Sequence, residues 1–173
     1  MTSLTFEEIY SKLLKLQIFQ YFKENDPEDK RILEEAFQLL TVKNFKAKDF
    51  IITEGEEADT FFILVKGSVQ ITRKTFSGDK LALANLDDTM GVSFGENSLI
   101  GKSARSASIQ ALTDCKTLVL TGGNFRQFSK REPSFGYKVL LSLAQQMSRT
   151  INKTNNDVST LYEALYNEIE EDN

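Results

Sequence analysis

The sequence predicts a mainly β fold, built as an antiparallel roll or barrel, with helices at both ends of the chain. Short runs of β-branched and aromatic residues fill the middle of the chain and are separated by glycine turns, whereas helical periodicity occurs only near the two ends. No helix-length segment separates the strand-like runs, which argues against a parallel α/β sheet. The 173 residues suffice for one domain with a helical appendage.

Two helix starts are visible in the N-terminal segment. Thr5 and Glu8 have the spacing of a capping box, in which side chains bond the unpaired backbone N–H groups at the start of a helix. Asp26 and Pro27 place a capping carboxylate before the residue type that is favoured at the first helical position. Residues 18–22, between these starts, form an apolar and aromatic cluster that we interpret as a docking patch.

The middle of the chain carries strand and turn signals. Gly55, Gly67 and Gly78 lie in turn signals that separate apolar runs. The strand-like runs are residues 50–52, 60–65, 69–72, 81–86, 106–112 and 116–121. Roughly seven or eight short strands in about 80 residues are typical of an antiparallel roll or barrel.

The C-terminal segment is predicted to be helical, with a short helix at 124–130 and a second helix that starts at Pro133. Apolar residues of the second helix recur at alternating steps of four and three, which is typical of a coiled-coil seam. The seam residues are Leu140, Ala144, Met147, Ile151, Val158, Leu161 and Leu165, with Thr154 as a weak member between Ile151 and Val158. The polar stretch 152–157 either lies within this seam or divides the segment into two helices.

These patterns divide the chain into three predicted units. We expect an N-terminal helical segment at 1–41, a β-roll at 42–132, and a C-terminal lid or dimerisation helix at 133–173. Residues Phe135, Tyr137, Val139 and Leu143 of the last unit either cover a ligand or pack in the core.

Composition excludes several classes of function. Lys and Arg number 21 against 25 Asp and Glu, so the net charge is −4, whereas nucleic-acid binding needs a basic face. The chain has no His, which removes His-based triads, His general bases and His metal ligands. We therefore expect no enzyme, no catalytic residue, no metal site and no nucleic-acid partner.

Three further features bear on the compartment. The lone Cys115 cannot form an internal disulfide, and we expect it to be a buried structural thiol. The longest apolar run, residues 61–65, is too short to span a bilayer. Glu7 and Glu8 lie where a signal peptide would carry positive charge. We expect a cytoplasmic protein with no membrane partner.

Residues 94–109 carry the most informative chemistry. A turn at Gly95 would expose backbone N–H groups at the start of a helical turn, which favours an anion there. Arg105 adds a planar guanidinium that can bind two phosphate oxygens at once. Glu96 would repel a bare phosphate, but its carboxylate is a strong acceptor for a hydroxyl. A phosphate beside a hydroxyl describes the sugar of a nucleotide, which the residues alone suggest without establishing.

The same segment resembles the phosphate-binding cassette of the cyclic nucleotide-binding domain family, which includes protein kinase A regulatory subunits and bacterial cAMP receptor proteins. The family pattern is Phe-Gly-Glu, an apolar residue, a small residue, Leu, a short loop, and then Arg-Ala-Ala-Thr-Val or a near variant. The residues that match this pattern in order are Phe94, Gly95, Glu96, Ser98, Leu99, Arg105, Ala107, Ser108 and Ile109. The likeness covers about residues 14–150.

The resemblance implies an eight-stranded antiparallel β-roll of the jelly-roll or cupin-like kind that binds cAMP or cGMP and needs no cofactor. Arg105 would pair with the cyclic phosphate, and Glu96 would accept the ribose 2′-hydroxyl. Backbone amides of the cassette would complete the cradle, and a hydroxyl after the arginine would touch the phosphate or the purine edge. The implied binding residues are Gly95, Glu96, Asn97, Ser98, Arg105 and Ser106.

This sequence departs from the family pattern at four places. Asn97 replaces an aliphatic residue, Ala104 replaces the usual proline before the arginine, and Ala58 replaces a usual glycine. The lead-in to the cassette is about two residues longer than usual and contains Asp87 and Asp88, which would disfavour an anion if they faced the site. These changes bear on which ligand the cassette accepts.

The leading hypothesis is a stand-alone regulatory module that binds cAMP or cGMP and transmits a conformational change through its C-terminal helix. Its partners would be the small nucleotide, an effector protein that the sequence does not identify, and a second copy in a homodimer. The alternative is a degenerate β-roll that binds no nucleotide and acts as a dimerisation or protein-interaction scaffold.

Overall fold

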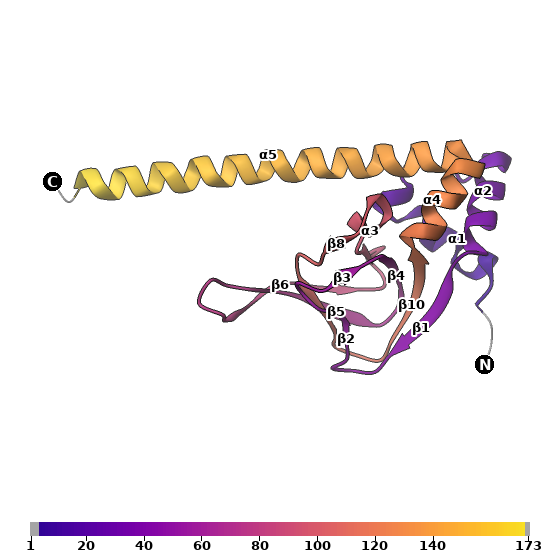
Figure 1. Cartoon of the computed structure of the whole chain (residues 1–173), viewed down its shortest axis with the longest axis horizontal. Coiled ribbons are helices and arrows are strands. Elements are labelled where there is room, and N and C mark those ends of the chain that lie inside the picture. The colour runs from indigo at the N-terminus through magenta and orange to yellow at the C-terminus, as the bar shows by residue number, and fades with distance from the viewer. Residues whose placement is uncertain (1–3, 172–173) are drawn as a thin grey trace.

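The computed structural model describes residues 4–171 and confirms the predicted class, because two antiparallel sheets form a roll with helices packed against it. Figure 1 shows the long helix α5 (Pro133–Glu171) along the top of the molecule, with its C-terminal half extending beyond the roll. The other helices gather around the first half of α5, at the end where the chain starts.

Each main sheet has four strands, and all strand pairs are antiparallel. In hydrogen-bonding order, the first sheet contains β1 (Thr41–Phe45), β10 (Cys115–Thr121), β4 (Thr60–Lys66) and β7 (Ser93–Phe94). The second contains β2 (Phe50–Ile52), β9 (Ser108–Ala111), β5 (Ser68–Lys74) and β6 (Lys80–Asp87). A short separate pair is β3 (Glu57–Ala58) and β8 (Ser103–Ala104).

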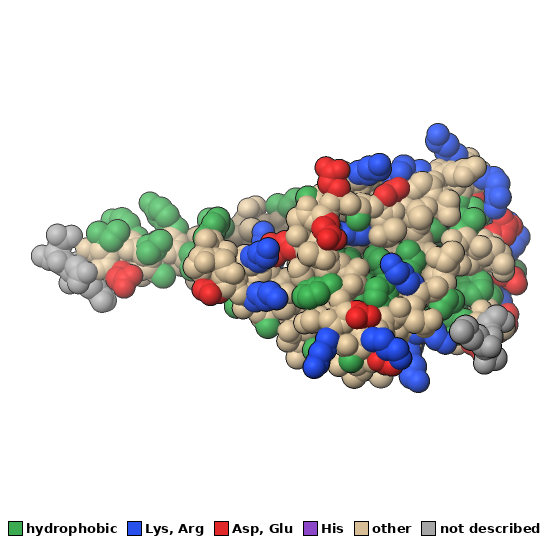
Figure 2. Space-filling view, turned by 60° about the horizontal axis from the view of Figure 1, so that its bottom comes forward, with side chains coloured by type: hydrophobic (Ala, Val, Ile, Leu, Met, Phe, Trp, Pro, Cys, Tyr) green, Lys and Arg blue, Asp and Glu red, His purple; other side chains and the backbone are tan. Residues whose placement is uncertain are grey.

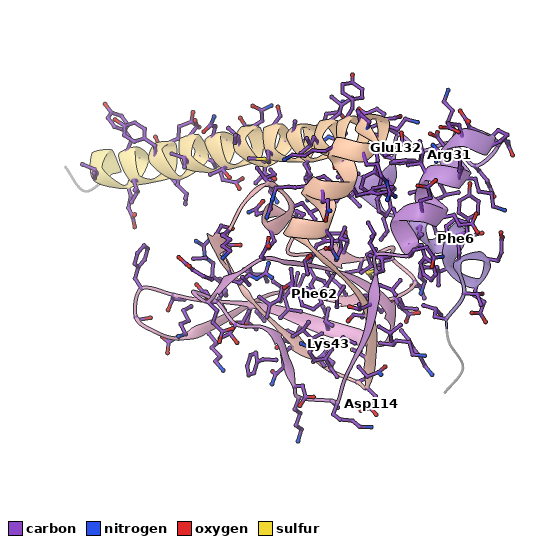
Figure 3. The ribbon with its side chains drawn as sticks, turned by 45° about the vertical axis from the view of Figure 1, so that its right-hand side comes forward. Phe6, Arg31, Lys43, Phe62, Asp114 and Glu132 are labelled. Atoms are coloured by element: carbon purple, nitrogen blue, oxygen red, sulfur yellow. The ribbon has the colours of Figure 1, made fainter. Side chains whose placement is uncertain are left out.

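Strand β4 is buried on both faces, which explains its continuous apolar sequence. Alternate residues of a strand point to opposite faces. Phe61 and Ile63 therefore join the core under the helices, whereas Phe62 and Leu64 join the core inside the roll. Figure 3 shows Phe62 inside the roll. The first sheet thus separates two hydrophobic cores and ties the roll to the helices.

Both predicted starts of N-terminal helices are confirmed. The N-terminal helices are α1 (Phe6–Leu14), the 3-10 helix η1 (Gln17–Phe19) and α2 (Pro27–Phe37). Glu8 Oε2 accepts a hydrogen bond from the Thr5 backbone N–H at 2.7 Å, as expected of a capping box. Asp26 Oδ1 accepts from the Glu28 N–H at 2.9 Å at the start of α2.

The docking patch at residues 18–22 receives α5. Phe19 and Phe22 are buried, and their ring centroids lie 6.4 Å and 6.0 Å from that of Phe135. The large apolar residues that are buried in this part of α5 recur at every fourth position: Phe135, Val139 and Leu143. These three side chains pack in the helix-facing core rather than forming an exposed lid, whereas Tyr137 is exposed on another face of α5.

Helix α4 (Gly122–Arg131) begins two residues before the predicted start at Asn124. The expected helix at 124–130 left Gly122 and Gly123 outside it. Gly122 is instead buried in the helix, where a Cβ atom would lie 2.1 Å from both Asp59 Oδ1 and the Ser98 carbonyl oxygen. The first glycine is therefore required by a close approach to the site described below, not by a turn.

Helix α5 is continuous through the polar stretch 152–157, so this stretch lies within the seam and does not divide two helices. At 1.5 Å per residue, its 39 residues extend over about 58 Å. Arg31 of α2 pairs with Glu132, the residue before α5, at 2.9 Å (Figure 3). This contact fixes the point at which α5 leaves α4.

A buried ion pair also joins α5 to α2. Lys138 Nζ contacts Asp29 Oδ1, and Asp29 is only 2% exposed. Breaking such a pair leaves a buried charge without its partner, so we expect Lys138→Met to lower the free energy of unfolding by about 3 kcal/mol in a urea titration. Lys46→Met is the control, because Lys46 pairs with Asp114 at the exposed surface and should contribute less than about 1 kcal/mol. Equal losses in the two variants would contradict this account.

Candidate ligand-binding site

The candidate site is built on a turn at Gly95, between β7 and the short helix α3 (Asn97–Ile100). Gly95 has a φ of +79°, in the left-handed region that favours glycine. A Cβ atom at this position would lie 2.6 Å from Arg105 Nη1 and 2.8 Å from the Thr60 carbonyl oxygen. Glycine is therefore required both by the backbone and by the approach of the guanidinium.

Arg105 lies against this turn and is only 8% exposed. Its Nη1 donates to Ser98 Oγ at 2.8 Å, and its Nη2 donates to the Thr60 carbonyl oxygen at 2.5 Å and to Thr60 Oγ1 at 2.9 Å. Burial lowers the pKa of the Arg105 guanidinium, and the negative charges of Glu96 and Asp59 oppose this shift. These hydrogen bonds hold the guanidinium in one orientation.

The acceptors around Arg105 are all uncharged. Within residues 4–171, no carboxylate oxygen lies within 4.0 Å of the Arg105 guanidinium. A buried cation without a paired anion is costly, because it has lost hydration and gained no counter-charge. The local electrostatics therefore favour an anion at this place.

A hollow of about 70 Å³ opens in front of Arg105. It is smaller than the roughly 300–1,000 Å³ that is usual for small-molecule sites, so it can hold only a small part of such a ligand. The residues that line it are Gly95, Glu96, Asn97, Ser103, Ala104, Arg105 and Ser106. The structure thus brings together, around one hollow, every residue that the sequence proposed for the site except Ser98.

Ser98 lies beside the hollow rather than in its lining. It is fully buried, its Oγ accepts from Arg105, and its backbone N–H donates to the Gly95 carbonyl oxygen at 3.1 Å. The expectation that the Ser98 amide faces a ligand is therefore not met in this structure. Ser98 instead holds Arg105 from the side that faces the protein.

A second hollow of about 260 Å³ lies between α3 and α5. Its lining is Glu96, Asn97, Leu143, Gln146, Met147, Thr150 and Ile151. It shares Glu96 and Asn97 with the first hollow, so a polar end and a partly apolar end meet at these two residues. Sequence reasoning missed Gln146 and Thr150, whose only signal is a pair of polar residues four positions apart beside the seam.

Helix α4 is joined to the cassette by Arg126. Its Nη1 donates to the Ser98 and Leu99 carbonyl oxygens at 3.4 Å each, and its Nη2 lies 3.5 Å from Asp59 Oδ2. The other carboxylate oxygen, Asp59 Oδ1, is buried and has no hydrogen-bond partner among the described residues. Arg126 thus links α3 to α4, and α4 leads directly into the start of α5.

The acidic lead-in does not face the hollow. Asp88 pairs with Lys12 of α1 at 2.9 Å, and this contact lowers the pKa of the Asp88 carboxyl. Asp87 accepts from the Thr89 N–H at 2.8 Å and closes a turn. Neither carboxylate lines the hollow, so neither opposes an anion there.

Other kinds of site were also considered. Residues 4–171 contain no cluster of three or more Cys, Asp or Glu side chains that could hold a metal ion. Cys115 is buried, and burial raises the pKa of its thiol, which fits the structural role expected for it. No helix within the described part of the chain is long and apolar enough to cross a membrane.

Two known proteins illustrate which sequences are similar to this chain. Human cGMP-dependent protein kinase 2 is 39% identical over 114 residues, which cover 61% of this chain and 15% of the kinase. The cAMP-activated global transcriptional regulator CRP of Pasteurella multocida is 31% identical over 121 residues, which cover 69% of this chain and 55% of the regulator. The chain thus spans little more than half of the regulator and a small part of the kinase.

Comparison with solved structures gives the same fold. The crystal structure of a cyclic nucleotide-binding domain from Methylobacillus flagellatus has a TM-score of 0.70 and 20% identity, and the match covers 86% of this chain and 82% of that one. The family model described as "Cyclic nucleotide-binding domain", a regulatory rather than catalytic domain, matches residues 42–132. Because this match covers more than half of the residues and includes the turn at Gly95 and the buried Arg105, the chain belongs to the cyclic nucleotide-binding domain family.

Proposed function

We propose that this chain is a non-catalytic regulatory module that binds cAMP or cGMP in the hollow at Gly95 and Arg105. The observation that carries the proposal is the buried Arg105 guanidinium, which has only uncharged acceptors and faces a small hollow that adjoins a larger one beside α5. A phosphodiester supplies the single negative charge that this position favours. Charge-assisted hydrogen bonds of this kind contribute roughly 1.5–3 kcal/mol each.

The two adjoining hollows support a ligand with two chemically different ends. In the proposed complex the cyclic phosphate meets Arg105, the 2′-hydroxyl meets Glu96, and the purine extends into the partly apolar hollow beside α5. Glu96 is the one carboxylate that lines both hollows, so a hydroxyl between phosphate and base would lie next to it. The Ser106 hydroxyl lies at the exposed edge of the first hollow, where it can touch the phosphate or the base.

Relatives support both nucleotides. The kinase is named for its dependence on cGMP and the regulator for its activation by cAMP, and they match 61% and 69% of this chain. The hydroxyl of Ser106 can donate or accept a hydrogen bond, so it is compatible with either purine. The proposal therefore includes both cyclic nucleotides, and a direct comparison decides between them.

We further propose that α5 carries the output and joins a second copy of the chain. The exposed apolar residues of α5 fit a heptad, with Ala144, Ile151, Val158 and Leu165 at the a positions and Leu140, Met147, Thr154 and Leu161 at the d positions. Most of these side chains are exposed, and Figure 2 shows hydrophobic side chains gathered on the projecting end of α5. Isolated helices are marginal in water, so a projecting helix with an apolar face favours a partner helix.

The heptad also indicates which partner fits. β-Branched residues at the a positions together with Leu at the d positions favour a coiled coil of two parallel helices. Ile151 and Val158 lie at a positions, and Leu161 lies at a d position. The charges at the flanking e and g positions decide which partner a coiled-coil helix accepts. In α5 only one of these positions is charged, Asp157. The residues at e and g are Leu141, Leu143, Ser148, Thr150, Asn155, Asp157, Tyr162 and Ala164. At these positions two identical helices meet no like-charge pair, and Glu168 is the first charged residue at a d position, so the apolar part of the seam up to Leu165 is compatible with a parallel homodimer.

The first test is a thermal-shift measurement with cAMP, cGMP and, as a control, 5′-AMP, which lacks the cyclic diester. A ligand at 100 times its dissociation constant stabilises the protein by about 2.7 kcal/mol, which for a chain of this size raises the melting temperature by about 5–10 °C. We expect such a shift with at least one cyclic nucleotide and a much smaller one with 5′-AMP. No shift with either cyclic nucleotide at millimolar concentration would favour the alternative, a scaffold that dimerises through α5 without binding nucleotide.

A further inference from the structure

One hydrogen bond joins α5 to the candidate binding residues. Gln146 Nε2 of α5 donates to Glu96 Oε1 at 3.3 Å, and both residues line the hollow between α3 and α5. Among the described residues 4–171, the other side-chain hydrogen bonds between α5 and the rest of the molecule involve Lys138 and Ser142 and are made with the N-terminal helical segment. Gln146 is therefore the polar contact between α5 and the cassette.

The contact occupies the group that the proposed ligand needs. Glu96 is the carboxylate proposed to accept the sugar hydroxyl, and its Oε1 already accepts from the Gln146 amide. An amide N–H and a sugar O–H are both neutral donors, so their hydrogen bonds to one carboxylate have similar strength. A hydroxyl that enters between the two hollows would compete with the amide for the same half-buried acceptor.

We propose that Gln146 is the positioning residue through which α5 responds to the ligand's sugar hydroxyl. Gln146 holds Glu96 while no ligand is present and gives up this carboxylate when a hydroxyl binds. This inference rests on the proposed function and adds to it the residue that links occupancy to α5.

The place of Gln146 on α5 supports this role. The next residue, Met147, belongs to the seam, and so does Ile151, four residues after it. Both line the same hollow as Gln146. A release of Gln146 would therefore occur beside the residues proposed to meet the second copy. A ligand without the 2′-hydroxyl leaves the hydrogen bond between Gln146 and Glu96 in place, so Gln146 is not released.

The test compares two ligands on two proteins. We would measure by calorimetry the affinity of wild type and of Gln146→Met for cAMP and for 2′-deoxy-cAMP, or for the matching cGMP pair if cGMP is the tighter ligand. Methionine keeps the length of glutamine and its helix propensity but has no N–H donor. In wild type the hydroxyl must displace Gln146, whereas in Gln146→Met it finds Glu96 free. We therefore expect the preference for the 2′-hydroxyl to increase about fivefold in Gln146→Met.

The neighbouring Gln145→Met is the matched control, because Gln145 has the same side chain on the same helix but lines neither hollow. It should leave the preference unchanged. If Gln146 only stabilised α5, both ligands would lose or gain affinity equally, and an unchanged preference in Gln146→Met would overturn the inference while the proposed function stands. If no cyclic nucleotide bound any of these proteins, the proposed function would fail, and this inference with it.

Discussion

Replacing Arg105 by Ala should weaken the binding of the cyclic nucleotide by about 2–4 kcal/mol, or roughly 30- to 1,000-fold. The guanidinium is buried, held by Ser98 and Thr60, and has no carboxylate partner among the described residues. Its charge is therefore available for an anion at little cost in reorganisation. Arg105→Lys keeps the charge but loses the planar fork, so its affinity should lie between those of wild type and Arg105→Ala.

Calorimetric titration of each variant measures this effect, and a melting curve of each protein without ligand shows that it is folded. Lys102→Ala is the matched control, since Lys102 is an exposed cation of the same loop that does not line the hollow. It should change the affinity less than about threefold. Equal losses in Lys102→Ala and Arg105→Ala would show a general effect of positive charge and contradict the assignment of Arg105.

Replacing Leu161 by Glu should convert the proposed dimer into a monomer. Leu161 is 63% exposed in the single chain and occupies a d position in the middle of the projecting part of α5. In a parallel homodimer two introduced carboxylates would face each other in an apolar seam, which combines loss of packing with charge burial. Sedimentation equilibrium should then give the mass of one chain, 19.6 kDa, rather than twice that mass.

Thr160→Glu is the control for this prediction. It adds the same charge at the neighbouring position, which lies at c of the heptad and outside the seam, so the dimer should persist. A wild-type protein that sediments as a monomer at micromolar concentration, or a Leu161→Glu variant with unchanged mass, would contradict the seam as a homodimer interface.

Much of the fold could be predicted because local patterns and tertiary structure agree. The capping interactions at Thr5 and Asp26 depend only on neighbouring residues, and both are present. The apolar run of β4 could be predicted to be a strand, because both faces of this strand are covered by protein and the run is therefore continuous. The expected helix started two residues after the true start of α4, where the lack of a side chain at Gly122 allows the close approach of Asp59 and Ser98. Such an approach between distant segments leaves no local signal.

The candidate site also contains residues that could be predicted from local sequence and residues that could not. Gly95, Glu96 and Arg105 belong to one continuous motif, so their proximity follows from a short segment of chain. Gln146 is 50 residues further on, and its contact with Glu96 depends on how α5 is rotated by the packing of its buried residues. The supporting role of Ser98 also depends on folding, because its hydroxyl faces Arg105 only once α3 is packed against β4.

The structure of the complex with a cyclic nucleotide tests the central claim most directly. The account predicts that a phosphate oxygen lies about 3 Å from an Arg105 Nη atom, with the 2′-hydroxyl on the Glu96 carboxylate. Arg105 would keep its hydrogen bonds to Thr60, and the base would lie beside α5. A nucleotide bound elsewhere on the molecule, or a bound nucleotide whose phosphate is held without Arg105, would contradict it.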